Sequence, residues 1–162
     1  MKFESLLSAF HEHSVFDYNT VSLFFEEEKP SSVKTSLYRF MKEGKLESLR
    51  RGLYTFAHHY RKKQLSAPQI ANLLYQPSYL SERWALGWYS IIPEKVVIYT
   101  SVSTRPTRSF NNKWGRFTYR TISDSEGKGI ITQVISGEKI KIAEKEQALL
   151  DFWYLEGGNW SP

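Results

Sequence analysis

The 162-residue sequence contains no cysteine and no apolar stretch that approaches the roughly 20 residues a membrane span needs. Without cysteine no disulfide framework can form, and a reducing compartment suits the chain. The first residues, Met1-Lys2-Phe3-Glu4, already include charged side chains and lack the long apolar run of a secretory signal. We therefore expect a cytoplasmic protein that does not enter a membrane.

The sequence also lacks the motifs on which many enzymes depend. It has no Gly-rich phosphate loop, no Gly-x-Ser-x-Gly elbow and no pair of acids at a motif spacing. Its four histidines occur at positions 11, 13, 58 and 59, spacings that do not suit a helical metal pair, and no cysteine could complete a zinc site. Glu146 and Asp151 are interpreted as ordinary surface acids. We expect no catalytic residue, no metal site and no cofactor.

Charge is distributed unevenly along the chain. Hydrophobic residues make up 41% of the sequence, enough for a packed core, which argues against global disorder. Residues 1–29 contain two Lys against six acids, residues 30–63 nine Lys/Arg against two acids, and residues 64–162 eleven against nine. A basic block as dense as residues 30–63 indicates a nucleic-acid-binding surface, and a merely solvated basic face is the alternative.

Hydrophobic spacing predicts two short helices before this block. The first is expected over residues 2–12, where Leu6, Leu7 and Phe10 recur at helical intervals. The second is expected to be capped by Asp17 or Asn19. Residues 26–30 end it, because a residue that precedes proline disfavours the helical conformation. The residues expected on its buried face are Val21, Phe24 and Phe25.

A third helix is predicted from a cap at Ser31 or Ser32 to about residue 43, where Gly44 stops it. Its apolar residues share one arc: Val33, Leu37, Phe40 and Met41. The opposite face has hydroxyl groups near its start and cations farther along: Ser31, Thr35, Tyr38, Arg39 and Lys42. A recognition helix needs short polar groups where it enters the major groove and cations that meet phosphates.

Residues 44–56 predict a β-hairpin directly after the third helix. Its turn is expected at Arg50-Arg51-Gly52, where glycine tolerates a positive φ. Two adjacent arginines at such a tip repel each other and gain no packing energy from folding, whereas a phosphate backbone would attract both. We therefore expect both side chains to be exposed. A hairpin in this position is the wing of a winged helix.

These elements predict a winged helix-turn-helix over residues 1–63 that binds double-stranded DNA. The expected base-edge contacts are Thr35, Tyr38 and Arg39, with Ser31, Ser32 and Lys34 near the entrance of the groove. The expected phosphate contacts are Lys42, Lys45, Arg50, Arg51 and Lys62. A winged helix that serves as a protein-interaction module is an alternative, because the fold alone does not define the partner.

The pattern changes at residues 64–68, after which we expect a small mixed α/β domain over residues 64–162. Helices are predicted from Pro68, from a cap at Ser81, and over residues 144–155. A period of two predicts strands over residues 95–100, 116–122, 129–135 and 139–142. The residues expected on the buried helix faces are Ile70, Leu73 and Leu74, then Trp84, Ala85 and Trp88, then Leu149, Phe152 and Trp153. The predicted fold class is therefore α+β.

A second basic run without an intervening acid follows in this domain: Arg105, Arg108, Lys113, Arg116 and Arg120. Aromatic residues lie among these cations: Phe110, Trp114, Phe117 and Tyr119. Aromatic rings interleaved with cations can stack on nucleic acid and neutralise it. A solvated loop that leads into a two-faced strand explains the run equally well.

Three stretches together resemble the AbiEi family, the antitoxin and transcriptional-regulator component of type IV toxin–antitoxin systems. They are Arg51-Gly52-Leu53-Tyr54, residues 70–94, and residues 140–151. The resemblance implies a winged helix that binds and represses the promoter of its own operon. It also implies a C-terminal domain that counteracts a nucleotidyltransferase-like toxin without forming a stable complex with it.

Members of that family usually continue with more helix, whereas this chain ends soon after Gly157-Gly158, which favours a fragment. A nucleic-acid-processing enzyme or its subunit is a further alternative. It would require a cluster of acids or histidines in three dimensions.

Overall fold

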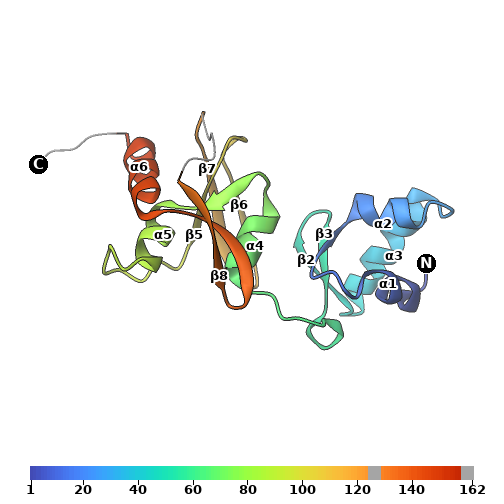
Figure 1. The fold of residues 1–162 in the computed structure, drawn as a ribbon. Coiled ribbons are helices and arrows are strands. Elements are labelled where there is room, and N and C mark those ends of the chain that lie inside the picture. Colours follow the sequence, from blue (N-terminus) through green and yellow to red (C-terminus); the bar gives the residue numbers. More distant parts are fainter. Residues whose placement is uncertain (124–128, 158–162) are drawn as a thin grey trace, which may run out of the picture. The chain divides into compact units, whose positions relative to one another are not determined.

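The computed structural model describes residues 1–123 and 129–157, so residues 158–162, on which the expectation of a fragment partly rests, lie outside the described residues. The chain forms two compact units, Met1–Leu65 and Ser66–Pro162. Each contains helices and one β-sheet (Figure 1). The predicted mixed α+β class is confirmed. None of the described helices is long and apolar enough to cross a membrane.

Unit 1 contains three helices and a three-stranded antiparallel sheet. The elements are α1 (Phe3–Phe10), β1 (Phe16–Asp17), α2 (Tyr18–Phe24), α3 (Pro30–Lys42), β2 (Leu46–Arg50), β3 (Leu53–Phe56) and the 3-10 turn η1 (His58–Tyr60). The sheet has the order β1-β3-β2. Gly52, at φ +80, forms the tight turn between β2 and β3, so the predicted hairpin is confirmed.

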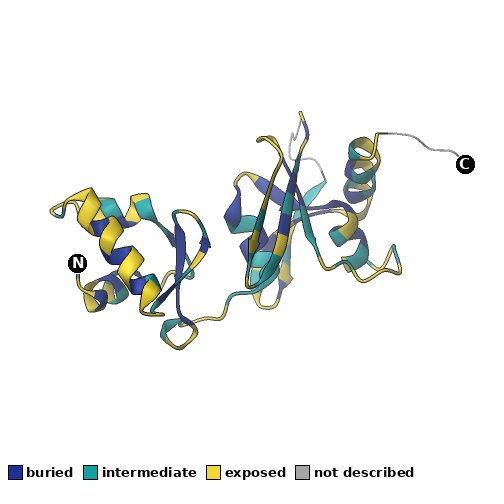
Figure 2. Ribbon diagram, turned by 180° about the vertical axis from the view of Figure 1, so that it is seen from behind, coloured by how far each residue is buried: buried dark blue, intermediate teal, exposed yellow. Residues whose placement is uncertain are grey.

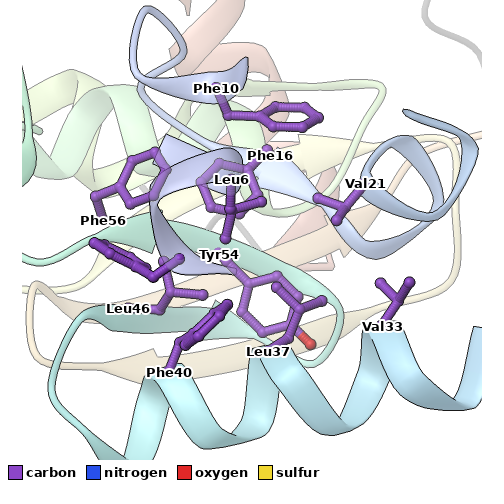
Figure 3. Packing of buried hydrophobic residues seen from close by; sticks show 11 residues of the cluster. Leu6, Phe10, Phe16, Val21, Val33, Leu37, Phe40, Leu46, Tyr54 and Phe56 are labelled. Atoms are coloured by element: carbon purple, nitrogen blue, oxygen red, sulfur yellow. The ribbon is translucent and has the colours of Figure 1, made fainter. Parts of the chain in front are cut away.

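One cluster of buried side chains joins the helices of unit 1 to its sheet (Figure 3). The rings of Phe3 and Phe40 meet edge to face with centroids 5.3 Å apart. Val33, Leu37 and Phe40 are buried as predicted, whereas Met41 is only half-buried. Exposed residues follow the opposite side of α3 (Figure 2). The core therefore fixes which face of this helix points outward.

Two details of unit 1 differ from the prediction. The helix α3 begins at Pro30, and no side chain caps it. Proline fits a first helical position because its φ is already helical and its missing N–H is not needed there. Ser31 and Ser32 thus lie within the first turn. Of the three residues expected on the buried face of α2, Val21 is buried, Phe24 is 61% exposed, and Phe25, which follows the last residue of the helix, is half-buried.

Unit 2 is built on a six-stranded mixed sheet in the order β6-β7-β5-β4-β9-β8. Its strands are β4 (Ser78–Leu80), β5 (Tyr99–Ser103), β6 (Arg108–Asn112), β7 (Gly115–Thr121), β8 (Ile130–Ile135) and β9 (Glu138–Ala143). Its helices are α4 (Ala67–Leu74), α5 (Glu82–Trp88) and α6 (Lys145–Leu155). The pairs β5–β7 and β4–β9 are parallel, and the other neighbours are antiparallel.

The helix α4 covers one face of this sheet, and α5 and α6 lie on the other (Figure 1). Consecutive residues of β7 illustrate the two faces, because side chains alternate along a strand. The hydroxyl of Tyr119 donates to the carbonyl of Ala71 in α4, whereas the guanidinium of Arg120 donates to Glu82 in α5. Each face of β7 therefore meets a different helix layer.

The strand predictions for unit 2 are partly wrong. Residues 78–80 form β4 inside the sheet and residues 108–112 form the edge strand β6, and neither is among the predicted strands. A strand of three residues is too short to show a period of two. The strand expected over residues 95–100 is β5, which begins at Tyr99.

The predicted buried faces of the three helices in unit 2 also need correction. In α4, Ala71 is buried and Leu73 only half-buried, and in α5 the residue Trp88 is exposed. In α6, Ala148 and Asp151 are buried, whereas Trp153 is 39% exposed. Ile70, Leu74 and Ala85 are buried as predicted, whereas Trp84 and Phe152 are only half-buried.

Candidate nucleic-acid interface

The outer face of α3 contains most of the residues predicted to contact DNA. All seven are exposed: Ser31, Ser32, Lys34, Thr35, Tyr38, Arg39 and Lys42. The helix contains no acid, and Arg39 and Lys42 lie in its last turn, where cations interact favourably with the helix dipole. The face therefore presents hydroxyl groups in the first turns and positive charge along its length.

Contacts within α3 hold several of these side chains in place. The hydroxyl of Thr35 donates to the carbonyl of Ser31 at 2.9 Å, which leaves its oxygen able to accept. The ammonium of Lys42 lies 5.3 Å from the ring centre of Tyr38, whose side chain is 57% exposed. Lys34 and Lys42 form no ion pair with any described residue. Their charges are thus available to a phosphate backbone.

Two predicted phosphate contacts, Lys45 and Lys62, are instead paired with acids of unit 1. The ammonium of Lys45 lies 2.8 Å from Oε2 of Glu43, and Lys62 pairs with Glu12. The hydrogen bond from Lys45 lowers the pKa of Glu43 and raises that of Lys45, and the bond from Lys62 lowers the pKa of Glu12. These surface pairs stabilise the fold little, but they offset positive charge.

Arg39 also has partners within the unit. Its Nε lies 3.9 Å from Oε1 of Glu43, and its guanidinium carbon lies 5.2 Å from the ring centre of Phe40. The contact with Glu43 is long and exposed, so it is weak. Arg39 can therefore exchange this carboxylate for a base edge or a phosphate.

The two arginines of the hairpin occupy different positions. Arg51 is exposed in the turn, as predicted. Arg50 is the last residue of β2, pairs with Leu53 and is half-buried, and its Nη1 donates to the carbonyl of Arg51 at 3.0 Å. The expectation that both are fully exposed is wrong for Arg50, because the ladder extends one residue farther than the sequence indicated.

The second basic run is divided between several places in unit 2. Arg108, Arg116 and Arg120 line one pocket. Arg105 and Lys113 do not line this pocket. The guanidinium carbon of Arg105 lies 4.0 Å from the ring centre of Tyr75, and the ammonium of Lys113 lies 4.6 Å from that of Trp114. The guanidinium of Arg108 also lies over Tyr75, at 6.0 Å from the ring centre, whereas Arg120 donates to Glu82 in α5, so the run is divided between the two faces of the sheet.

Two of the four interleaved aromatic residues are not available for the stacking that one interpretation of the basic run requires. Phe117 and Tyr119 are completely buried on the face of β7 from which the hydroxyl of Tyr119 donates to Ala71 of α4. The ring of Phe110 lies near those of Tyr75 and Tyr119, with centroids 5.9 and 5.8 Å apart. The predicted stacking role is wrong for Phe117 and Tyr119.

Unit 2 also contains a buried polar cluster that the sequence did not indicate. Asp151, interpreted as a surface acid, is 4% exposed. It accepts hydrogen bonds from the hydroxyls of Tyr79 and Ser81 at 2.8 and 2.7 Å and from Nε2 of Gln147 at 2.8 Å. Burial and the charge of Asp151 raise the pKa of Tyr79, so its hydroxyl stays a donor. Three donors thus offset the cost of burying the carboxylate.

Glu82 is a second buried acid, and nothing in the sequence indicated it. It is 2% exposed and begins α5 at φ +57, a strained value for a residue other than glycine. Its Oε1 accepts a 2.9 Å bond from Arg120, whereas its buried Oε2 has no hydrogen-bond partner among the described residues. Burial raises the pKa of Glu82 to about 7, although the charge of Arg120 acts in the opposite direction.

Within residues 1–123 and 129–157 no group of three His, Asp or Glu side chains is placed to hold a metal ion. No protein-family model matches the chain, and a comparison with curated proteins finds no match either.

Proposed function

We propose that unit 1 is a winged helix-turn-helix that binds double-stranded DNA, with α3 as the recognition helix and the β2–β3 turn as the wing. The observation that carries the proposal is the exposed, acid-free outer face of α3. The element order and the position of the hairpin directly after α3 support the winged interpretation.

Each part of this surface has a role in the proposal. Thr35, Tyr38 and Arg39 contact base edges in the major groove, because they lie on the outer face of α3. Lys42 and Arg51, which have no acid partner among the described residues, bind phosphates. Lys45 and Lys62 contribute less, since their acid partners already offset their charges.

The biological role that fits this activity is transcriptional repression by an AbiEi-like antitoxin in the cytoplasm. The three stretches that resemble this family lie in the β2–β3 turn and β3, in the segment from α4 to just beyond α5, and in β9 and α6. Under this proposal unit 1 binds the promoter of its own operon. Unit 2 counteracts a nucleotidyltransferase-like toxin without binding it stably, and the protein itself catalyses no reaction.

The DNA-binding proposal is tested by the salt dependence of binding to a labelled duplex, measured by fluorescence anisotropy on the full chain. Lys34→Ala/Lys42→Ala should make the slope of log K against log salt less negative by roughly 1.8, about 0.9 for each lost phosphate contact. The control Lys45→Ala/Lys62→Ala removes the same charge and should change the slope by less. Equal slopes for the two variants, or no binding by the wild type at low salt, would contradict the proposal.

A further inference from the structure

Two arginines of unit 2, Arg105 and Arg108, gather around the ring of Tyr75, the residue that follows α4. Their guanidinium carbons lie 4.0 and 6.0 Å from the centre of that ring. Arg108 stands opposite Tyr119 in the β6–β7 ladder, and Tyr119 donates to Ala71 of α4. Residues directly opposite each other in an antiparallel pair share a face of the sheet. Both arginines therefore lie on the side of the sheet that α4 covers.

Contacts within unit 2 position the two guanidinium groups before any ligand binds. Nη1 of Arg105 donates to the carbonyl of Gln76 at 3.1 Å, which leaves Nε and Nη2 without a hydrogen-bond partner in the described chain. The guanidinium carbon of Arg108 also lies 4.9 Å from the ring centre of Phe110. The ring of Tyr75 is itself fixed, since its hydroxyl donates to a backbone carbonyl at 2.9 Å. Side chains held in this way lose little entropy when they bind a ligand.

No acid lies in the segments that surround this pair. Residues 48–81 and 95–123 contain neither Asp nor Glu, and they include α4 and the strands β4 to β7. Along the sheet from β6, the first strand with an acid is β9, beyond β4. The helices of the opposite side, α5 and α6, contain Glu82, Glu146 and Asp151. The two faces of unit 2 thus differ in charge, and the α4 side near β6 is the positive one.

The chemistry of the pair indicates a ligand with many phosphate groups. Both arginines are exposed, and single exposed ion contacts are weak, so such a pair suits a ligand that repeats its charge. Duplex DNA carries one charge about every 1.7 Å along its axis, and guanidinium groups bind phosphate oxygens in a bidentate geometry. A single strand would also need exposed rings for its bases, whereas Phe117 and Tyr119 are buried. These features favour a duplex.

We propose that Arg105 and Arg108 bind backbone phosphates of the same duplex that α3 contacts. This inference rests on the proposed function, because α3 recruits the DNA. Residues 61–66 join η1 to α4 and tether unit 2 to the bound unit 1, which raises the local concentration of DNA at the pair. The contact adds affinity and salt dependence but no sequence preference, because phosphates carry no information about the bases.

Fluorescence anisotropy of the full chain with a labelled duplex, at several salt concentrations, tests this inference. Arg105→Ala/Arg108→Ala should make the slope of log K against log salt less negative by roughly 1.8, about 0.9 for each lost phosphate contact. The matched control Arg83→Ala/Arg116→Ala removes two exposed arginines from the α5 side of the sheet and should change the slope much less. Equal slopes for the two variants, or an unchanged slope for Arg105→Ala/Arg108→Ala, would overturn the inference.

The same titrations distinguish this inference from the proposed function. If the wild type binds no duplex at low salt, both are wrong. If Lys34→Ala/Lys42→Ala changes the slope and Arg105→Ala/Arg108→Ala does not, only the contact from unit 2 is wrong.

Two further measurements keep the outcome decisive. If Arg105→Ala/Arg108→Ala does not fold by circular dichroism, Arg108→Gln decides alone, with an expected change in slope of about 0.9. Arg108 forms no hydrogen bond with a described residue, so its replacement removes none from the fold. A single-stranded oligonucleotide of the same length that binds the wild type more tightly than the duplex, and loses this advantage in Arg108→Gln, would replace the duplex by a single strand as the ligand.

Discussion

The hydroxyl of Tyr79 in β4 donates a 2.8 Å hydrogen bond to Oδ2 of Asp151 in α6. The bond joins a strand inside the sheet of unit 2 to the last described helix. Because Ser81 and Gln147 donate to the same carboxylate, three side chains depend on one buried acid. Asp151 therefore holds α6 on the sheet by polar contacts, although the helix lacks a continuous apolar face.

Asp151→Ala should lower the free energy of unfolding by about 3–5 kcal/mol, because each buried donor left without a partner costs about 1–3 kcal/mol. Urea denaturation of the full chain, followed by tryptophan fluorescence and circular dichroism, measures the loss. Glu146→Ala changes an exposed acid of the same helix and should stay within about 0.5 kcal/mol of the wild type. Similar small effects for both variants would mean that the buried cluster contributes little.

Glu82 should make stability depend on pH. Its pKa rises from 4.5 to about 7 on folding, so the folded state binds the proton more tightly than the unfolded state. The resulting stabilisation is complete below pH 4.5 and is lost as the pH rises through 7. Glu82→Gln does not titrate. The unfolding free energy of the variant relative to the wild type should therefore increase over this window by up to about 3 kcal/mol, at about 1.4 kcal/mol per pKa unit.

Denaturation series at several pH values between 4 and 8, roughly the window that the shift defines, provide this comparison. Glu156→Gln removes the exposed partner of Arg120 and should show a much smaller dependence. A relative stability of Glu82→Gln that stays constant across the window would show that Glu82 titrates normally.

Glu43 restrains two cations of the proposed interface, since it contacts Lys45 at 2.8 Å and Arg39 at 3.9 Å. Glu43→Gln should release them and tighten duplex binding roughly two- to fivefold at low salt, the scale of an exposed ion pair. The slope of log K against log salt should become more negative. Glu94→Gln makes the same change in net charge in unit 2, and an equal gain there would indicate a general charge effect.

The predictions from sequence are most accurate where a single physical pattern is dominant. The apolar arc of α3 places Val33 and Leu37 in the core, and this alone determines that Lys34 and Tyr38 point outward. Gly52 marks the turn of the hairpin because its positive φ is costly for other residues. Local signals of this kind are present in the sequence before any tertiary contact is known.

The buried acids could not be found in the same way. Asp151 lies three residues after the buried Ala148 on one face of α6, a weak signal that the neighbouring aromatic residues obscured. Glu82 depends on Arg120, 38 positions away, and only the sheet topology brings them together. The short strand β4 is likewise defined by its partners β5 and β9. Long-range pairing determines these features, and local propensity does not.

The most direct test of the DNA-binding account is a titration of the ¹⁵N-labelled full chain with duplex DNA at low salt, followed by the backbone amide signals. The account predicts that the signals of Ser31, Thr35 and Tyr38 in α3 and of Arg51 and Gly52 in the turn shift first and most. The amide signals of residues on the buried side of α3, such as Val33, should shift only slightly, through the changes at neighbouring residues. Shifts confined to unit 2, or no shifts at any duplex concentration, would contradict it.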